Sequence, residues 1–159
     1  MIDEKHLGRR YGPYRYVVGL EEIRDFAVTL AGGIPGRVFA GEAPEAPHPW
    51  FVDEDAARAS PHGGIIAPPT FCVRFAMQPF ALACADPALG IDLVKLLHGE
   101  QLFEYGDPVR PGDLLETTGE IVDIRQKAGK DFLSVKTTTV NQRGRTVVVG
   151  TWKAVVLSS

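Results

Sequence analysis

Residues 68–85 read PPTFCVRFAMQPFALACA and are apolar on nearly every side except at Arg74 and Gln78. A helix that is hydrophobic all round is a buried helix. The two opening prolines suit its first turn, where the amides lack intrahelical partners. Pro79 removes the hydrogen bond to the carbonyl of Phe75. The segment therefore predicts a buried central helix with a kink or a break at Pro79.

Four long runs rich in Val, Ile, Leu and Thr follow this helix. They cover residues 94–105, 114–125, 132–141 and 146–157. The connections GDPVRPGD, QKAGKD and QRGR have the composition of hairpin turns. Within the third run, one predicted face carries Leu133, Val135, Thr137 and Thr139, and the other carries Phe132, Ser134, Lys136 and Thr138. This alternation predicts a half-buried antiparallel meander.

The sequence before the central helix predicts less regular structure. Residues 14–18 predict a short strand, and residues 20–30 have the spacing of a helix that ends at Gly32 and Gly33. Residues 34–62 are rich in proline and predict a long ordered loop, with one helical turn around VDEDAARAS. Such a long loop is often functional.

A sheet of long twisted strands has one apolar face to cover, and the 68–85 helix is the only element apolar enough to cover it. The expected fold class is therefore α+β, a hot-dog fold in which a long antiparallel sheet wraps around a central buried helix. We expect one such domain over residues 1–159. The sheets of two hot-dog units usually join edge to edge.

Composition excludes several classes of protein. The 159 residues are 45% hydrophobic and 23% charged, with a net charge of −3. This charge lacks the excess of basic residues that is typical of nucleic-acid-binding proteins. No apolar stretch approaches the roughly 18 residues of a membrane span, and the polar N-terminus predicts no signal peptide. Cys72 and Cys84 are expected to be buried, unbridged thiols in a cytoplasmic protein. Small molecules or proteins are the expected partners.

The motifs that suggest chemistry are each ambiguous. His98 and Glu100 stand two residues apart on a predicted strand, where both side chains would share one face and could form an acid–base pair or an interface pair. The sequence His62-Gly63-Gly64 could aim backbone amides at an anion or a polarised carbonyl, or form a turn. The acidic residues 53–55 near His48 are more typical of a solvated face than of a metal site. We expect no metal and no cofactor.

Three longer stretches resemble a known family. LHGEQLFEY, residues 97–105, followed by a proline and RPGD, resembles the N-terminal half of the peroxisomal (R)-specific enoyl-CoA hydratases. GGIIAPPTF (63–71) and FEYGDPVRPGDLLETTGEIVDIR (103–125) resemble the FAS1-like, MaoC N-terminal dehydratase domain. That domain also occurs as the accessory subunit of two-subunit bacterial acyl-ACP dehydratases and acyl-CoA hydratases. The resemblance covers residues 20–156.

The resemblance implies addition of water across a trans-2-enoyl thioester, or its reversal. In the family an Asp and a His in the pattern D-x-N-P-[ILV]-H hold the water, and a glycine amide in IAHGM polarises the thioester carbonyl. In APHPWF, residues 46–51, Ala46 stands for the aspartate, His48 for the asparagine and Phe51 for the histidine. In IAPPT, residues 66–70, Pro68 and Pro69 replace the histidine and the glycine of IAHGM, and proline has no N–H.

These losses imply the non-catalytic half of a hydratase or dehydratase. Its partner would be a MaoC-like hot-dog subunit that bears the dyad, and its ligand an acyl-CoA or acyl-ACP thioester. The residues expected to line or border the acyl chain are Pro68, Pro69, Thr70, Phe71, Arg74 and Phe75. The alternatives are a self-sufficient homodimeric hydratase that uses His48, His62 or His98 with Glu100, and an acyl-CoA-binding hot dog without turnover. The LHGEQ and RPGD segments argue against a thioesterase.

Overall fold

The computed structural model describes residues 2–32 and 46–157. The elements before the central helix are η1 (Glu4–His6), β1 (Arg10–Val17), α1 (Leu20–Leu30), α2 (Pro49–Val52) and α3 (Glu54–Ala59). They are followed by η2 (Pro69–Cys72), α4 (Val73–Ala76), α5 (Gln78–Cys84), η3 (Pro87–Leu89), η4 (Leu93–Lys95), β2 (Leu96–Tyr105), β3 (Leu114–Lys127), β4 (Lys130–Val140) and β5 (Thr146–Val156). Backbone contacts divide the chain into two compact units. The first unit holds Met1–Tyr16, Cys72–Asp107 and Leu115–Ser159, and the second holds Val17–Phe71 and Pro108–Leu114.

The strands form one sheet in the order β1-β3-β4-β5-β2. β3, β4 and β5 are the expected antiparallel meander. The prediction that the first long strand continues this meander is wrong, because β2 pairs with β5 at the far edge and not with β3. The tight turn between β3 and β4 places Ala128 and Gly129 at positive φ, as two-residue hairpins require. The segment between β2 and β3 makes no hairpin.

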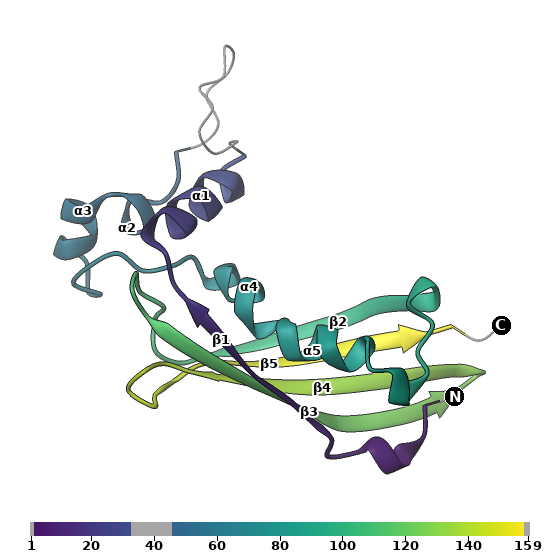
Figure 1. Cartoon of the computed structure of the whole chain (residues 1–159). Helices are drawn as coiled ribbons and strands as arrows, with labels where there is room; N and C mark the ends of the chain where they lie inside the picture. Colours follow the sequence, from purple (N-terminus) through teal and green to yellow (C-terminus); the bar gives the residue numbers. More distant parts are fainter. Residues whose placement is uncertain (1, 33–45, 158–159) are drawn as a thin grey trace. The chain divides into compact units, whose positions relative to one another are not determined.

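The central helix is buried, as expected, but is divided into shorter pieces. α4 ends before Met77, and α5 begins at Gln78 with Pro79 in its first turn, so the predicted break is confirmed. α4 and α5 lie along one face of the sheet, against β4 (Figure 1). Gly119 of β3 makes room for the break, since a Cβ atom there would lie 2.5 Å from the Cβ of Pro79.

The core lies between these helices and the sheet. Its largest fully buried side chains include Trp152, Phe75, Leu133 and Val135. Leu133, Val135, Thr137 and Thr139 of β4 are all buried, which confirms the predicted alternation. No helix in residues 2–32 and 46–157 has the length and apolar character needed to cross a membrane.

Both cysteines are free and buried, as expected. Burial raises the pKa of the Cys72 thiol and that of the Cys84 thiol from 9.0 to about 11. A hydrogen bond with Tyr105 partly opposes this rise at Cys72. The two thiols are therefore protonated and inert near neutral pH.

The second unit contains α1, α2 and α3. α1 matches its predicted bounds and buries Ile23 and Ala27. α3 confirms the helical turn expected within the long loop, and Asp53 caps it by accepting from the amides of Asp55 and Ala56. α2 was not predicted, although the imidazole of His48 accepts from the Trp50 amide as a local N-cap. Residues 34–45 of the predicted loop lie outside the described residues.

Candidate functional site

The segment LHGEQ lies at the start of β2 and contains a β-bulge. His98 stands opposite Ala154 and Glu100 opposite Lys153, so Gly99 is an extra residue without an opposite number on β5. Ala154 and Lys153 are adjacent and must point to opposite faces of the sheet. The expectation that His98 and Glu100 share a face, which regular alternation predicts, is therefore wrong.

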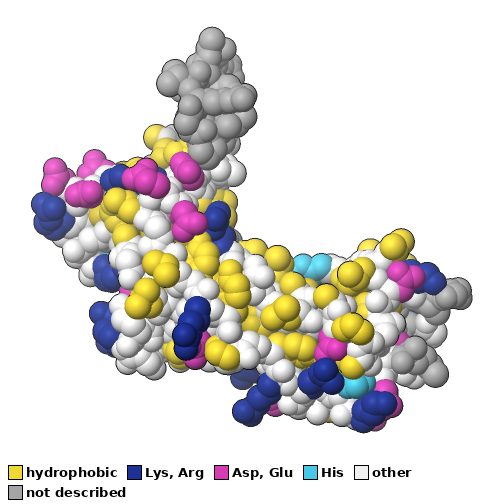
Figure 2. All heavy atoms as spheres, in the orientation of Figure 1, with side chains coloured by type: hydrophobic (Ala, Val, Ile, Leu, Met, Phe, Trp, Pro, Cys, Tyr) yellow, Lys and Arg dark blue, Asp and Glu magenta, His cyan; other side chains and the backbone are white. Residues whose placement is uncertain are grey.

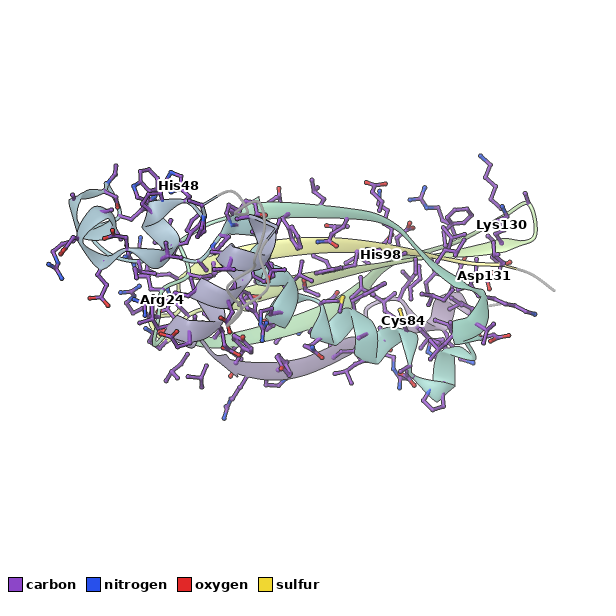
Figure 3. All side chains as sticks on the ribbon, turned by 90° about the horizontal axis from the view of Figure 1, so that it is seen from above. Arg24, His48, Cys84, His98, Lys130 and Asp131 are labelled. Carbon is purple, nitrogen blue, oxygen red and sulfur yellow. The ribbon has the colours of Figure 1, made fainter. Side chains whose placement is uncertain are left out.

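The surroundings of the two side chains agree with this assignment. The His98 ring lies 5.6 Å from the ring of Phe80 in α5 and 5.9 Å from that of Trp152 (Figure 3). Glu100 accepts from Nζ of Lys153 at 2.9 Å and is exposed. His98 thus faces the helices while Glu100 belongs to the outer face, so the two cannot act on one proton.

The positions that correspond to the family's dyad carry no acid or base. Ala46 is exposed and precedes α2, while Phe51 is half-buried within α2. The Phe51 ring packs against His48, and Trp50 packs edge-on against both His48 and His62. In the part of the chain that the structure describes, no histidine forms a hydrogen bond or an ion pair with a carboxylate. This cluster is aromatic packing and lacks a base held by an acid.

The position that corresponds to the family's polarising glycine has no amide to donate. The amide of Ile66 donates to the carbonyl of Trp50 at 3.3 Å, and that of Ala67 donates to Val109 at 2.8 Å. The next two residues, Pro68 and Pro69, have no N–H. The amides of residues 66 and 67 are thus engaged, and residues 68 and 69 have none.

The glycine pair before the helix forms a turn. Gly63 has φ +67° and its amide donates to the carbonyl of Ser60 at 3.0 Å. A glycine at positive φ is the ordinary choice for such a turn. The turn interpretation of His62-Gly63-Gly64 therefore fits the geometry better than the anion-site interpretation.

The RPGD segment fixes this turn in place. The carboxylate of Asp113 is buried and accepts from the Arg110 amide at 2.8 Å, while Gly112 sits at φ +83°. The guanidinium of Arg110 donates to the carbonyl of His62 at 2.7 Å. RPGD is thus a side-chain-capped turn that anchors the chain ahead of the central helix. The sequence signal was the Asp three residues after Arg110, which is typical of such turns.

The six residues predicted to border the acyl chain divide by exposure. Phe71 and Phe75 are fully buried and pack against Phe26 and Tyr16, respectively. Pro68 is also buried. The other three are exposed, namely Pro69, Thr70 and Arg74. Nε of Arg74 donates to the hydroxyl of Tyr16 at 3.0 Å, which holds the cation at the helix surface.

The acidic residues near His48 have local partners. Besides the cap made by Asp53, Glu54 pairs with Arg24 at 3.4 Å and Asp55 pairs with Arg58 at 3.2 Å. Among residues 2–32 and 46–157, no three His, Cys, Asp or Glu side chains gather in a way that could hold a metal ion.

Two open hollows occur on the surface of the described chain. One of about 640 Å³ lies in the first unit, where Arg10 and Glu120 form an ion pair beside Lys136 and Thr138. The other, of about 320 Å³, lies in the second unit beside Glu54, Arg58, Gly63 and Gly64. Neither contains a histidine or a cysteine, so neither presents a recognisable acid–base or nucleophilic pair.

Comparison of the sequence with protein families matches residues 5–149 to the FAS1-like, dehydratase domain region. A UPF0336 protein of Streptomyces griseus is 36% identical over 155 residues, which cover 97% of this chain and 94% of that protein. A UPF0336 protein of Saccharopolyspora erythraea is 35% identical over 147 residues, covering 92% of this chain and 85% of its own length.

Solved structures with the same architecture confirm the predicted hot-dog fold. A MaoC-like dehydratase from Rhodospirillum rubrum has a TM-score of 0.69 and 23% identity over 100% of this chain and 98% of its own. Another MaoC-like dehydratase reaches a TM-score of 0.78 and 26% identity over 98% of this chain and 43% of its own. The Mycobacterium tuberculosis HadBC complex, a 3R-hydroxyacyl-ACP dehydratase, has a TM-score of 0.73 and 22% identity, over 94% of this chain and 96% of its own.

Proposed function

The chain belongs to the family of FAS1-like dehydratase domains, and within that family we propose that it is the non-catalytic, substrate-accommodating subunit of an (R)-specific enoyl thioester hydratase or dehydratase. The partner subunit would be a second MaoC-like hot-dog chain that carries the Asp and His dyad. Together they would add water across a trans-2-enoyl thioester or remove it from a 3-hydroxyacyl thioester.

The observation that carries this proposal is the state of the dyad segment. Ala46 and Phe51 cannot take or give a proton, and no described histidine is held by a carboxylate. General acid–base catalysis needs a titratable group within reach of the proton that moves. The two prolines at the helix start also remove the amide that would stabilise an enolate oxygen. Both halves of the family's apparatus would have to come from another chain.

The sheet offers a place for that chain. β2 is the last strand of the sheet and pairs with β5 alone among the described strands. Its exposed side chains include Leu97, Leu102 and Tyr105. A long edge strand with exposed apolar side chains is a template for pairing with another sheet. The structurally similar HadBC dehydratase is itself described as a complex, which favours a hetero-oligomer over a homodimer.

The substrate would be an acyl-CoA or acyl-ACP thioester whose acyl portion passes the central helix. Of the residues predicted to border it, Pro69, Thr70 and Arg74 are accessible in the single chain. Arg74, fixed by Tyr16, offers a permanent positive charge that suits the phosphate-bearing carrier arm. The buried Phe71 and Phe75 would contribute to the packing that holds the exposed residues of this segment in place.

Reconstitution tests the proposal. This chain, a MaoC-like chain encoded near it that carries D-x-N-P-x-H, and the co-expressed pair are each assayed for crotonyl-CoA hydration. The expected result is activity from the pair, with little from either chain alone. A pair whose second chain has its dyad His changed to Ala serves as the control and should be inactive.

Other outcomes would count against the silent-subunit role. Turnover by this chain alone would favour the self-sufficient homodimer. Equal activity of the partner with and without this chain would leave the chain no role in the reaction. Saturable binding of the thioester by this chain, without turnover in any combination, would favour a binding protein.

A further inference from the structure

His98 occupies an unusual position for a polar side chain. It is exposed, lies on the helix-facing side of the sheet, and sits on the strand that ends the described sheet. Its ring rests on Phe80 and Trp152, which stack on each other with centroids 5.7 Å apart. We call Phe80, Phe103 and Trp152 the aromatic shelf, because Phe103 also packs edge-on against Trp152 at 5.3 Å.

The aromatic shelf is rigidly held. Nε1 of Trp152 donates to Oγ1 of Thr137 at 2.8 Å, and both residues are fully buried. A Cβ atom at Gly150 would lie 2.6 Å from that indole nitrogen and 2.7 Å from the threonine hydroxyl. Because glycine has no Cβ atom, it leaves room for the indole of Trp152. The imidazole above it rests on a fixed surface rather than on a mobile one.

The bulge at Gly99 places His98 and Glu100 on different faces of β2. If Gly99 were instead a regularly paired residue, the side chains at positions 98 and 100 would share one face, and one of them would leave its present surroundings. Bulges often re-aim a side chain near a binding site. Here the bulge separates an outer-face residue, Glu100, which is paired with Lys153, from an inner-face residue, His98. Among the described residues, the imidazole of His98 makes no hydrogen bond.

Exposed apolar side chains precede this position in the chain. Val94 is 93% exposed, and Leu93 is more than half exposed. On α5, Leu82 is 51% exposed. Figure 2 shows hydrophobic side chains recurring over the α4 and α5 side of the first unit. When a partner covers such a surface, a polar imidazole within it must find a hydrogen-bonding group or lose favourable free energy.

We propose that His98 is a substrate-contacting residue that this chain contributes to the composite site, where its imidazole hydrogen-bonds a polar group of the bound thioester. The inference rests on the proposed function. The group is either the oxygen of the acyl portion or an amide of the carrier arm, since a neutral imidazole offers one donor and one acceptor. The acyl thioester would run on the helix-facing side of the sheet, where His98 lies. On the outer face, the charge of Glu100 is already paired with Lys153.

The test uses the assembled pair and three variants of His98. His98→Phe keeps a ring on the aromatic shelf but has no hydrogen-bonding atom, and His98→Ala removes both. His98→Asn keeps a donor and an acceptor. A lost hydrogen bond of about 1.4 kcal/mol corresponds to roughly a tenfold change. We expect His98→Phe and His98→Ala to raise KM about tenfold with a smaller change in kcat, and His98→Asn to recover part of the loss.

Two further measurements make the result specific. Lys136→Gln, on the outer face of β4, is the matched surface control and should leave KM unchanged. Hydration of crotonyl-CoA is compared with that of crotonyl-N-acetylcysteamine, which lacks most of the carrier arm. If the loss disappears with the short thioester, the group bound lies in the part of the arm that this thioester lacks; if it persists, the group is the acyl oxygen or the one amide that N-acetylcysteamine keeps.

The outcomes separate this inference from the proposed function. An active wild-type pair in which His98→Phe retains the wild-type KM would overturn the role of His98 and leave the silent-subunit role standing. An inactive wild-type pair would overturn both. Size-exclusion chromatography reports assembly, and if His98→Ala fails to assemble, His98→Phe decides the question.

Discussion

The central strand β4 and the edge strand β2 look alike in sequence but behave differently in the sheet. β4, Lys130–Val140, buries the alternate residues Leu133, Val135, Thr137 and Thr139, although Ser134 between the first two is buried as well. β2, Leu96–Tyr105, loses its alternation at Gly99. β4 has neighbours on both sides that fix its register, whereas β2 is bonded only to β5 among the described strands. An alternating pattern therefore places side chains correctly where the pairing is regular, as over most of β4, and incorrectly across a bulge, as at Gly99 of β2.

The strongest test of this comparison is deletion of Lys136 from β4. Loss of one residue there moves the side chains of all β4 residues on one side of the deletion to the opposite face of the sheet. Either Leu133 and Val135 or Thr137 and Thr139 would leave the core. Because a domain of this kind is stable by only about 5–15 kcal/mol, we expect no cooperative folded state. Circular dichroism with thermal denaturation would measure this, and a native-like melting transition would contradict it.

The next largest effect is expected from Gly119→Val. This change tests the close packing of β3 against the helix break at Pro79. A Cβ atom at Gly119 would lie 2.5 Å from the Cβ of Pro79, so α5 or β3 must move. Overpacking of this kind costs roughly 1–3 kcal/mol, and we expect the upper part of that range in urea denaturation. Pro79→Gly in the same background removes that Cβ and should recover part of the loss, and purely additive effects would argue against the contact.

The sequence predicted those parts of the fold that local pattern determines. Residues 20–30 had helical spacing, the 68–85 segment was apolar on nearly every side, and the run at 132–141 alternated. Strand order depends on which long-range pairing forms, and nothing local to 96–105 identifies β5 as its neighbour. The turn GDPVRPGD looked like a hairpin because its Asp113 cap and Gly112 have hairpin composition.

The candidate site was predictable where a residue type settles the chemistry. The side chains of Ala46 and Phe51 cannot take or give a proton in any conformation, and Pro69 has no N–H to donate. The faces of His98 and Glu100 were not predictable, because glycine is compatible with both a regular strand and a bulge. The exposure of Arg74 depends on how α4 lies on the sheet, and the burial of Phe71 depends on its packing against Phe26. Sequence alone does not fix that placement.

The two cysteines extend the comparison to pH. The pKa of each thiol is raised from 9.0 to about 11, in the case of Cys84 by burial alone. A thiol whose folded pKa is raised contributes stability that is fully present below about pH 9 and is lost as pH rises toward about 11. We expect the urea midpoint of the wild type to fall more between pH 8.5 and 10.5 than that of Cys84→Ala, the difference being modest. Parallel curves for the two proteins would show that Cys84 does not titrate with unfolding.

The smallest effect is expected where intuition suggests a large one, on deletion of Gly99 from β2. Gly99 is the extra residue of the bulge, so its removal leaves His98 opposite Ala154 and Glu100 opposite Lys153 in regular pairing. Each side chain keeps its face, in contrast to deletion of Lys136 from β4. We expect a loss below about 1 kcal/mol, the range of ordinary surface changes plus local relaxation, and an intact fluorescence spectrum from the buried Trp152. Deletion of Gln101 is the matched control, because it removes a paired residue and shifts the faces of one part of the strand. If both deletions lower the stability by the same amount, the bulge itself would be important for the stability of β2, and the faces of the side chains around it would not explain the effect.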